Sequence, residues 1–170
     1  MGHAIIDCDI HPAPSADSPV EAYYPDEIRL AIQQKQNERP SHGYANPWGG
    51  QRRHVECPDL ADIRPALLDR DGDSYGALAP PGLSGGLVHS VPVADGLARA
   101  YNDWLIEEFL EKDERLLGSV SINTANPHAA ATEIRRVGSH PRMVQVCVSG
   151  ESEALYGHPM YEPILAACED

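Results

Sequence analysis

The sequence has little positive charge and no long apolar run. Its 13 lysine and arginine residues stand against 26 aspartate and glutamate residues, so the formal net charge is −13. A surface of this sign repels nucleic-acid phosphates and anionic lipid, and we expect neither a nucleic-acid partner nor a membrane partner. No apolar run approaches the length of a membrane span, and no basic start leads into an apolar stretch. We therefore expect neither a membrane helix nor a signal peptide.

Several short motifs are also missing. No two of the four cysteines form a C-x-x-C pair, which argues against a zinc ribbon or a redox pair. Cys8 and Cys147 lie in apolar, strand-like runs, so we expect both to be small buried residues. We expect the protein to be located in the reducing cytoplasm. No G-x-G-x-x-G follows a strand pattern, and no Walker lysine or nucleophile elbow occurs. These absences argue against a nucleotide-binding domain and against a serine hydrolase.

Strand-like and helix-like patterns alternate along the 170 residues. Short apolar runs typical of buried strands cover residues 4–12, 74–79, 116–122 and 143–148. Helical periodicity covers residues 25–35, 59–70, 93–112, 126–137 and 159–167. This alternation predicts an α/β fold in which about four parallel strands are joined by right-handed crossovers and flanked by helices. An open doubly wound sheet and part of a (β/α)8 TIM barrel both fit.

The first apolar run ends in two side chains that can bind a metal ion. Asp9 and His11 are two residues apart, and such residues on a strand point to the same face. A carboxylate and an imidazole on one face can hold one divalent ion. The same spacing also arises by chance, since an Asp or His at a strand end is commonly a capping or solvated group. Two ligands alone do not complete a metal site.

Three further residues are candidates for contact with a substrate. Arg52 and Arg53 lie in a long polar loop over residues 37–57, where they could bind a carboxylate through paired hydrogen bonds. The alternative is a solvated basic patch. His158 follows the fourth strand pattern and could contact a substrate, or it could only stabilise the turn that contains it.

Four segments carry a family resemblance. They cover residues 5–11 (IIDCDIH), 98–105 (ARAYNDWL), 113–118 (DERLLG) and 155–164 (LYGHPMYEPI). In this order they resemble amidohydrolase family 2, the amidohydrolase-related metal-dependent hydrolases and decarboxylases of the aminocarboxymuconate-semialdehyde decarboxylase type. The resemblance spans nearly the whole chain.

The resemblance implies a (β/α)8 barrel with a divalent metal at the C-terminal ends of its strands. Asp9 and His11 would be the first two metal ligands, with zinc the favoured ion and manganese possible. Residues 1–170 would form a single domain, the N-terminal half of the barrel, truncated before the fifth strand. The implied activity is hydrolysis or decarboxylation of a small organic substrate that bears a carboxylate. We expect the 170-residue chain alone to be inactive.

A non-catalytic role is the alternative. A half-barrel has open strand edges and an uncovered inner face, and such surfaces drive association. The chain could therefore be an assembly module that forms a homo-oligomer. Two copies would place two pairs of Asp9 and His11 at one mouth.

Overall fold

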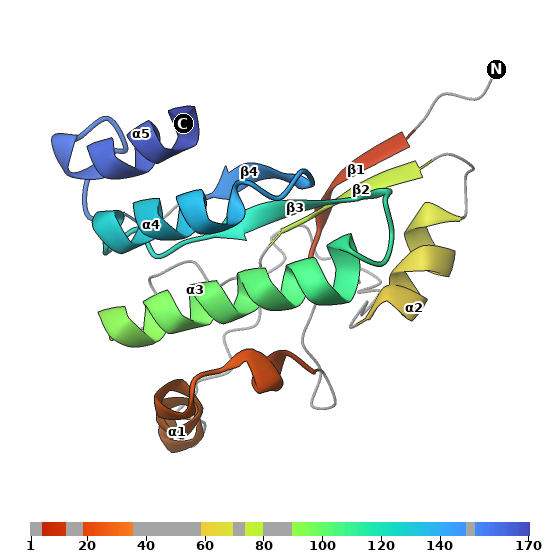
Figure 1. Cartoon of the computed structure of the whole chain (residues 1–170), viewed down its shortest axis with the longest axis horizontal. Helices are drawn as coiled ribbons and strands as arrows, with labels where there is room; N and C mark the ends of the chain where they lie inside the picture. Colours follow the sequence, from red (N-terminus) through yellow and green to blue (C-terminus); the bar gives the residue numbers. More distant parts are fainter. Residues whose placement is uncertain (1–4, 13–18, 36–58, 70–73, 80–89, 149–151) are drawn as a thin grey trace, which may run out of the picture.

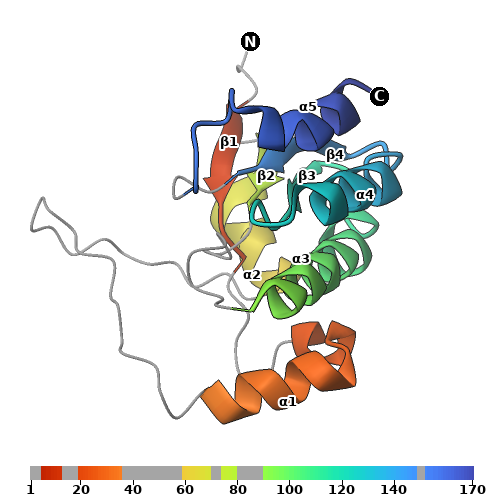
Figure 2. The same ribbon diagram turned by 90° about the vertical axis from the view of Figure 1, so that its left-hand side faces the viewer.

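The computed structural model describes residues 5–12, 19–35, 59–69, 74–79, 90–148 and 152–170. Its four strands form one parallel sheet in the order β1 (Ile5–Ile10), β2 (Ser74–Leu78), β3 (Leu116–Ser121) and β4 (Met143–Cys147). Three helices lie on one side of this sheet (Figures 1 and 2): α3 (Val91–Leu105), α4 (Pro127–Val137) and α5 (Glu162–Glu169). The predicted α/β arrangement of four parallel strands with flanking helices is confirmed.

Shorter elements complete the described fold. A 3-10 turn at Pro19–Tyr23 leads to α1 (Asp26–Lys35), which packs on the outer side of α3 (Figure 1). The short helix α2 (Leu60–Ile63) precedes β2, and a 3-10 turn at Pro159–Tyr161 precedes α5. None of the described helices has both the length and the apolar character that a membrane crossing requires.

Two of the predicted helices are interrupted by π-helical turns, at Arg64–Leu68 and Ile106–Leu110. Pro65 lies at the start of the first turn, and because it has no N–H it cannot donate to the carbonyl group four residues earlier. The chain closes instead over five residues, with the Asp69 N–H donating to the Arg64 carbonyl at 2.8 Å. The second turn makes the same five-residue step without a proline.

The core lies between the sheet and its helices. Trp104 of α3 is fully buried at its centre, with edge-on ring contacts to Tyr101 at 5.3 Å and Phe109 at 5.0 Å between centroids. The apolar stripes expected for α3 and α4 are buried, which confirms the helical periodicity. Their buried members are Leu97, Ala100, Tyr101, Trp104, Leu105 and Phe109, and Ala130, Ala131, Ile134 and Val137.

β1 differs from the prediction of a buried strand. Five of its six residues are exposed and only Ile10 is buried. Cys8 is exposed and Cys147 is half-buried, so the expectation that both thiols lie in the core is wrong. The physical reason is their position, because β1 and β4 are the two edges of the described sheet and each has a strand neighbour on one side only.

A buried asparagine connects the end of β3 to two helices. Asn102 of α3 accepts a hydrogen bond from the Ser121 N–H at 2.7 Å through Oδ1. Its amide nitrogen donates to the Ser121 carbonyl at 3.0 Å and to Glu133 Oε1 of α4 at 2.8 Å. Asn102 therefore fixes the C-terminal end of β3 relative to α3 and α4.

We expect Asn102→Ala to lower the free energy of unfolding by about 2–3 kcal/mol, because it leaves the buried N–H and carbonyl of Ser121 without their partner. Urea denaturation followed by circular dichroism measures this loss. The matched control is Thr132→Ala, which removes an exposed hydrogen bond to the His128 carbonyl within α4 and should cost less than about 0.5 kcal/mol. Equal losses in the two variants would contradict the role given to Asn102.

Candidate metal centre

The strand pairing shows which residues face away from the helices. A Cβ atom on Gly76 would meet Leu68 and Leu116, and one on Gly118 would meet Leu105 and Leu110, so both glycines face the helix side. Because side chains alternate along a strand, their neighbours face the other side, which we call the inner face. The inner face carries the small residues Ala77, Ala79, Ser119 and Ser121 near the C-terminal ends of β2 and β3.

β1 has an irregular register that positions the candidate ligands. Asp7 pairs with Gly76 and Ile10 pairs with Leu78, so β1 has one residue more than β2 between these pairs. A bulge of this kind re-aims the side chains that follow it. Ile10 points to the helix side and accepts a hydrogen bond from the Ala79 N–H at 2.8 Å through its carbonyl. The residues on either side of Ile10 therefore lie on the inner face.

Asp9 and His11 converge on this face, as their spacing predicts. His11 Nε2 lies 2.9 Å from Asp9 Oδ1. The Asp9 side chain is 85% exposed and the His11 side chain 49% exposed, so an ion can reach both. The two groups sit at the C-terminal end of a parallel strand, where barrel enzymes hold their reactive groups. Metal binding by the pair stays a prediction.

The donor atoms have a separation that suits a shared ion. Two ligand atoms at about 2.1 Å from an octahedral ion are about 3.0 Å apart when they are neighbours, whereas tetrahedral ligands at about 2.05 Å are about 3.4 Å apart. The observed 2.9 Å is the length of an ordinary hydrogen bond between His11 and Asp9, so it places the two groups close enough to share an ion and does not choose between the two geometries. Within the described ranges, no cluster of three or more His, Cys, Asp or Glu residues could hold a metal ion. Asp9 and His11 are therefore two candidate ligands, and the described residues bring no third one beside them.

Cys147 shares the inner face with this pair. It lies at the end of β4 and pairs with Ser121 of β3. Burial raises the pKa of the Cys147 thiol, and the Asp9 carboxylate raises the pKa further. Asp9 and Cys147 thus lie at the C-terminal ends of the two edge strands of the described sheet.

The other predicted site residues have different outcomes. Arg52 and Arg53 lie outside the described residues. His158 is exposed, and its Nδ1 accepts a hydrogen bond from the Met160 N–H at 3.2 Å at the start of the 3-10 turn. The structure thus places His158 as the cap of a turn, and its contact with a substrate stays a prediction.

The sequence did not predict a cluster of polar contacts at the C-terminal ends of the strands. The Asp95 carboxylate of α3 accepts hydrogen bonds from Asn123 Nδ2 at 2.8 Å and Asn126 Nδ2 at 2.7 Å. These bonds hold the loop after β3 against the start of α3. Asp95 lies 28 and 31 residues before the two asparagines, so no local pattern connects it with them.

The fold and the candidate site together define a class of protein. Four parallel strands with helices outside, and an acid–imidazole pair at the C-terminal end of the first strand, form part of a (β/α)8 barrel. The amidohydrolase family model matches residues 6–170. The chain belongs to the amidohydrolase family.

The relatives that resemble this chain include several decarboxylases. The gamma-resorcylate decarboxylase of Rhodococcus jostii (strain RHA1) is 28% identical over 124 residues, which cover 65% of this chain and 37% of that protein. A variant of 5-carboxyvanillate decarboxylase from Novosphingobium aromaticivorans was solved with manganese and 3-methoxy-4-hydroxy-5-nitrobenzoic acid. It matches with a TM-score of 0.70 at 18% identity, over 99% of this chain and 48% of that chain.

A 2,6-dihydroxybenzoate decarboxylase solved with 2,6-dihydroxybenzoate also matches, with a TM-score of 0.63 at 18% identity. The match covers 99% of this chain and 47% of that chain. The chain thus spans about half the length of these solved relatives and 37% of the curated one. At 18% identity the two solved structures support the fold.

We expect Cys147 to react with iodoacetamide more slowly than the exposed Cys168, because burial and the Asp9 carboxylate both raise the Cys147 pKa. Asp9→Asn removes one of these causes, lowers the Cys147 pKa and speeds its alkylation. Asp7→Asn is the matched control, since Asp7 does not contribute to the shift. Peptide mass spectrometry measures the rates. If Asp9→Asn left the Cys147 rate unchanged, the two groups would not share the inner face.

Proposed function

We propose that Asp9 and His11 are the first-strand ligands of a divalent metal in a decarboxylase that acts on a small aromatic carboxylate. The observation that carries the proposal is the 2.9 Å approach of Asp9 Oδ1 to His11 Nε2 on the inner face, at the C-terminal end of β1. The three relatives compared above are all named as decarboxylases of hydroxylated aromatic acids, which favours decarboxylation over hydrolysis. The chain would supply the N-terminal half of the barrel.

Manganese is the metal that we propose. A carboxylate is a hard ligand, which suits manganese. The solved relative from Novosphingobium also holds manganese. Zinc, which the sequence resemblance favoured, is the second candidate.

A bound ion of this kind acts as a Lewis acid that polarises a coordinated oxygen. The chain's own residues bind the ion and contact the substrate in the function that we propose. The Asp9 carboxylate supplies negative charge next to the ion. His11 offers an imidazole nitrogen as the second ligand. Arg52, Arg53 and His158 are proposed to contact the substrate, the two arginines through its carboxylate.

We also propose that Asp9 and His11 act together with further ligands when they hold a catalytic ion. Two protein ligands leave most positions of an octahedral ion to water. Catalytic metal sites commonly have at least three protein ligands, which fix the orientation of the open position. The described residues offer two.

We expect Asp9→Asn and His11→Ala each to weaken Mn²⁺ binding at least about tenfold, because each removes one direct ligand. Titration of Mn²⁺ followed by electron paramagnetic resonance of the free ion measures the affinity, and competition with Zn²⁺ compares the two metals. His128→Ala is the control, since His128 is exposed on α4. An Asp9→Asn chain that binds Mn²⁺ as tightly as the unaltered chain would contradict the proposed function.

A further inference from the structure

Both β1 and β4 have one residue more than the strand with which they pair. In β1 the extra residue comes just before the candidate metal ligands. In β4, Met143 pairs with Gly118 and Gln145 pairs with the next residue of β3, Ser119, so Val144 is the extra residue. Irregularities of this kind are common beside active sites, where they re-aim a side chain. The side chain that follows the irregularity in β4 is that of Gln145.

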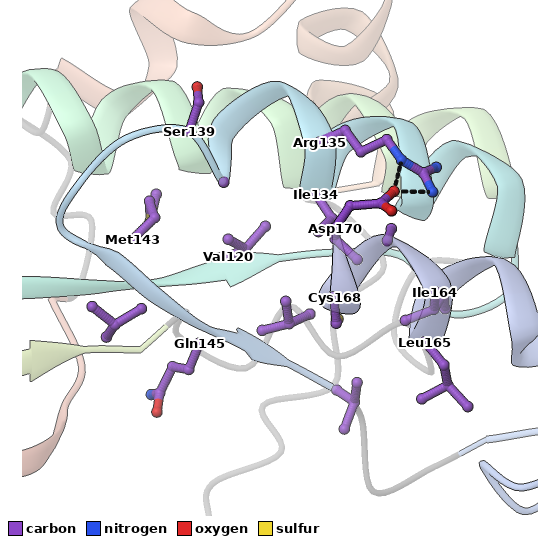
Figure 3. A pocket seen from close by; sticks show the side chains of 15 residues that line it. Val120, Ile134, Arg135, Ser139, Met143, Gln145, Ile164, Leu165, Cys168 and Asp170 are labelled. Atoms are coloured by element: carbon purple, nitrogen blue, oxygen red, sulfur yellow. Dashed lines mark hydrogen bonds and ion pairs between the residues drawn. The ribbon is translucent and has the colours of Figure 1, made fainter.

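The extra residue places Gln145 on the inner face. Met143 is buried on the helix side, where its sulfur would lie 2.7 Å from a Cβ atom at Gly118. Residues two apart on a regular strand share a face, so Gln145 would also point to the helices if the register did not shift. Its pairing with Ser119 places it on the inner face instead. Gln145 borders the groove beside α4, but its side chain points away from α4 (Figure 3).

Gln145 lies in the same row of the sheet as His11. One row of paired residues crosses the first three strands and consists of Ile10, Leu78 and Gly118. The residues that directly follow it form the next row, which lies on the inner face, continues into β4 and consists of His11, Ala79, Ser119 and Gln145. The two ends of this row are three strand spacings apart, about 14 Å along the sheet. The row thus connects a candidate metal ligand on one edge strand with a carboxamide on the other.

A ligand on this part of the inner face can reach Gln145. The side chains of Ala77 and Ala79 form no hydrogen bonds, and Ser119 and Ser121 are buried. Gln145 is exposed. Near the C-terminal ends of β2, β3 and β4, it is the one strong hydrogen-bonding side chain of the described inner face that is exposed. We therefore expect it to decide which polar groups a bound ring can carry.

The carboxamide of Gln145 is held in one orientation. Its Nε2 donates a hydrogen bond to Ser119 Oγ at 2.7 Å, and Ser119 is fully buried. No described residue donates a hydrogen bond to its Oε1. An amide oxygen can accept two hydrogen bonds, so Oε1 offers an unused acceptor. Because the group is already held in place, it loses little conformational freedom when a ligand binds.

We propose that Gln145 is a specificity-determining residue of the candidate site, whose Oε1 accepts a hydrogen bond from a hydroxyl group on the ring of an aromatic acid. The inference rests on the proposed function, which supplies the ion at Asp9 and His11 and the aromatic carboxylate. The ring lies over Ala79 and Ser119, whose small side chains leave room for it. A phenolic O–H donates a hydrogen bond and the unsubstituted ring has no such donor, so Gln145 favours hydroxylated acids.

Isothermal titration calorimetry of the chain with benzoate, 3-hydroxybenzoate and 4-hydroxybenzoate in the presence of Mn²⁺ tests the role of Gln145. We expect the more tightly bound hydroxybenzoate to bind roughly three- to tenfold more tightly than benzoate, as one net hydrogen bond predicts. Gln145→Leu keeps the approximate size of the side chain and removes the acceptor. It should abolish this preference and leave the affinity for benzoate close to that of the unaltered chain.

Two further variants control the measurement. Ser119→Ala keeps the carboxamide but removes the group that holds it, so the preference should fall less than in Gln145→Leu. Val144→Ala is the matched control, because Val144 precedes Gln145 on the same strand and borders the groove beside α4 and α5. Its preference should equal that of the unaltered chain. Circular dichroism checks that each variant is folded.

Nuclear magnetic resonance gives a direct second readout. The side-chain amide signals of Gln145 are identified by their loss in Gln145→Leu. We expect the preferred hydroxybenzoate to shift them more than benzoate does. Equal affinities for the three acids, no binding of any of them, or a preference that survives in Gln145→Leu would each overturn the inference.

Titration with Mn²⁺ separates this inference from the proposed function. Gln145→Leu should bind Mn²⁺ like the unaltered chain, because Gln145 is not a proposed ligand. A chain that binds Mn²⁺ through Asp9 and His11 but does not distinguish the acids keeps the proposed metal site and contradicts the role of Gln145. A preference that depends on Gln145 in a chain that binds no Mn²⁺ does the reverse.

Discussion

The positions of Asp9 and His11 depend on how β1 pairs with β2. Ile10 points into the core, where Gly76 leaves the room that it needs: a Cβ atom at Gly76 would lie only 2.5 Å from Ile10 Cδ1. The hydrogen bond from the Ala79 N–H to the Ile10 carbonyl fixes the same register. Because side chains alternate along a strand, an Ile10 side chain on the helix side places Asp9 and His11 on the inner face. A slip of one residue would turn both toward the helices and destroy the site.

Polar contacts in the rest of the described chain hold β3 in place at both of its ends. Asn102 of the ARAYNDWL segment fixes the end of β3. Asp113 of the DERLLG segment lies before β3, at the other end of the strands, where hydrogen bonds from Arg115 and Arg64 hold the pKa of its carboxyl well below the ordinary value. In two of the segments that carry the family resemblance, Asn102 and Asp113 thus make polar contacts that hold the scaffold together.

Local patterns predicted most of the fold and one part of the site. The apolar periodicity located all four strands and the helix stripes, and the two-residue spacing placed Asp9 and His11 on one face. The exposure of β1 was missed, because an apolar run does not reveal whether its strand is central or at an edge. The π-helical turn at Pro65 had a visible signal in the proline itself. The hydrogen bonds from Asn123 and Asn126 to Asp95 had no signal in the sequence, because they depend on how α3 packs against the loop after β3.

The central claim is that one divalent ion can bind to both Asp9 and His11. Anomalous diffraction at the manganese absorption edge, from crystals of the chain grown with Mn²⁺, tests it most directly. The account predicts a peak within bonding distance of both the Asp9 carboxylate and His11 Nε2. A peak that touches neither group, or density that places the two side chains on opposite faces of β1, would contradict it.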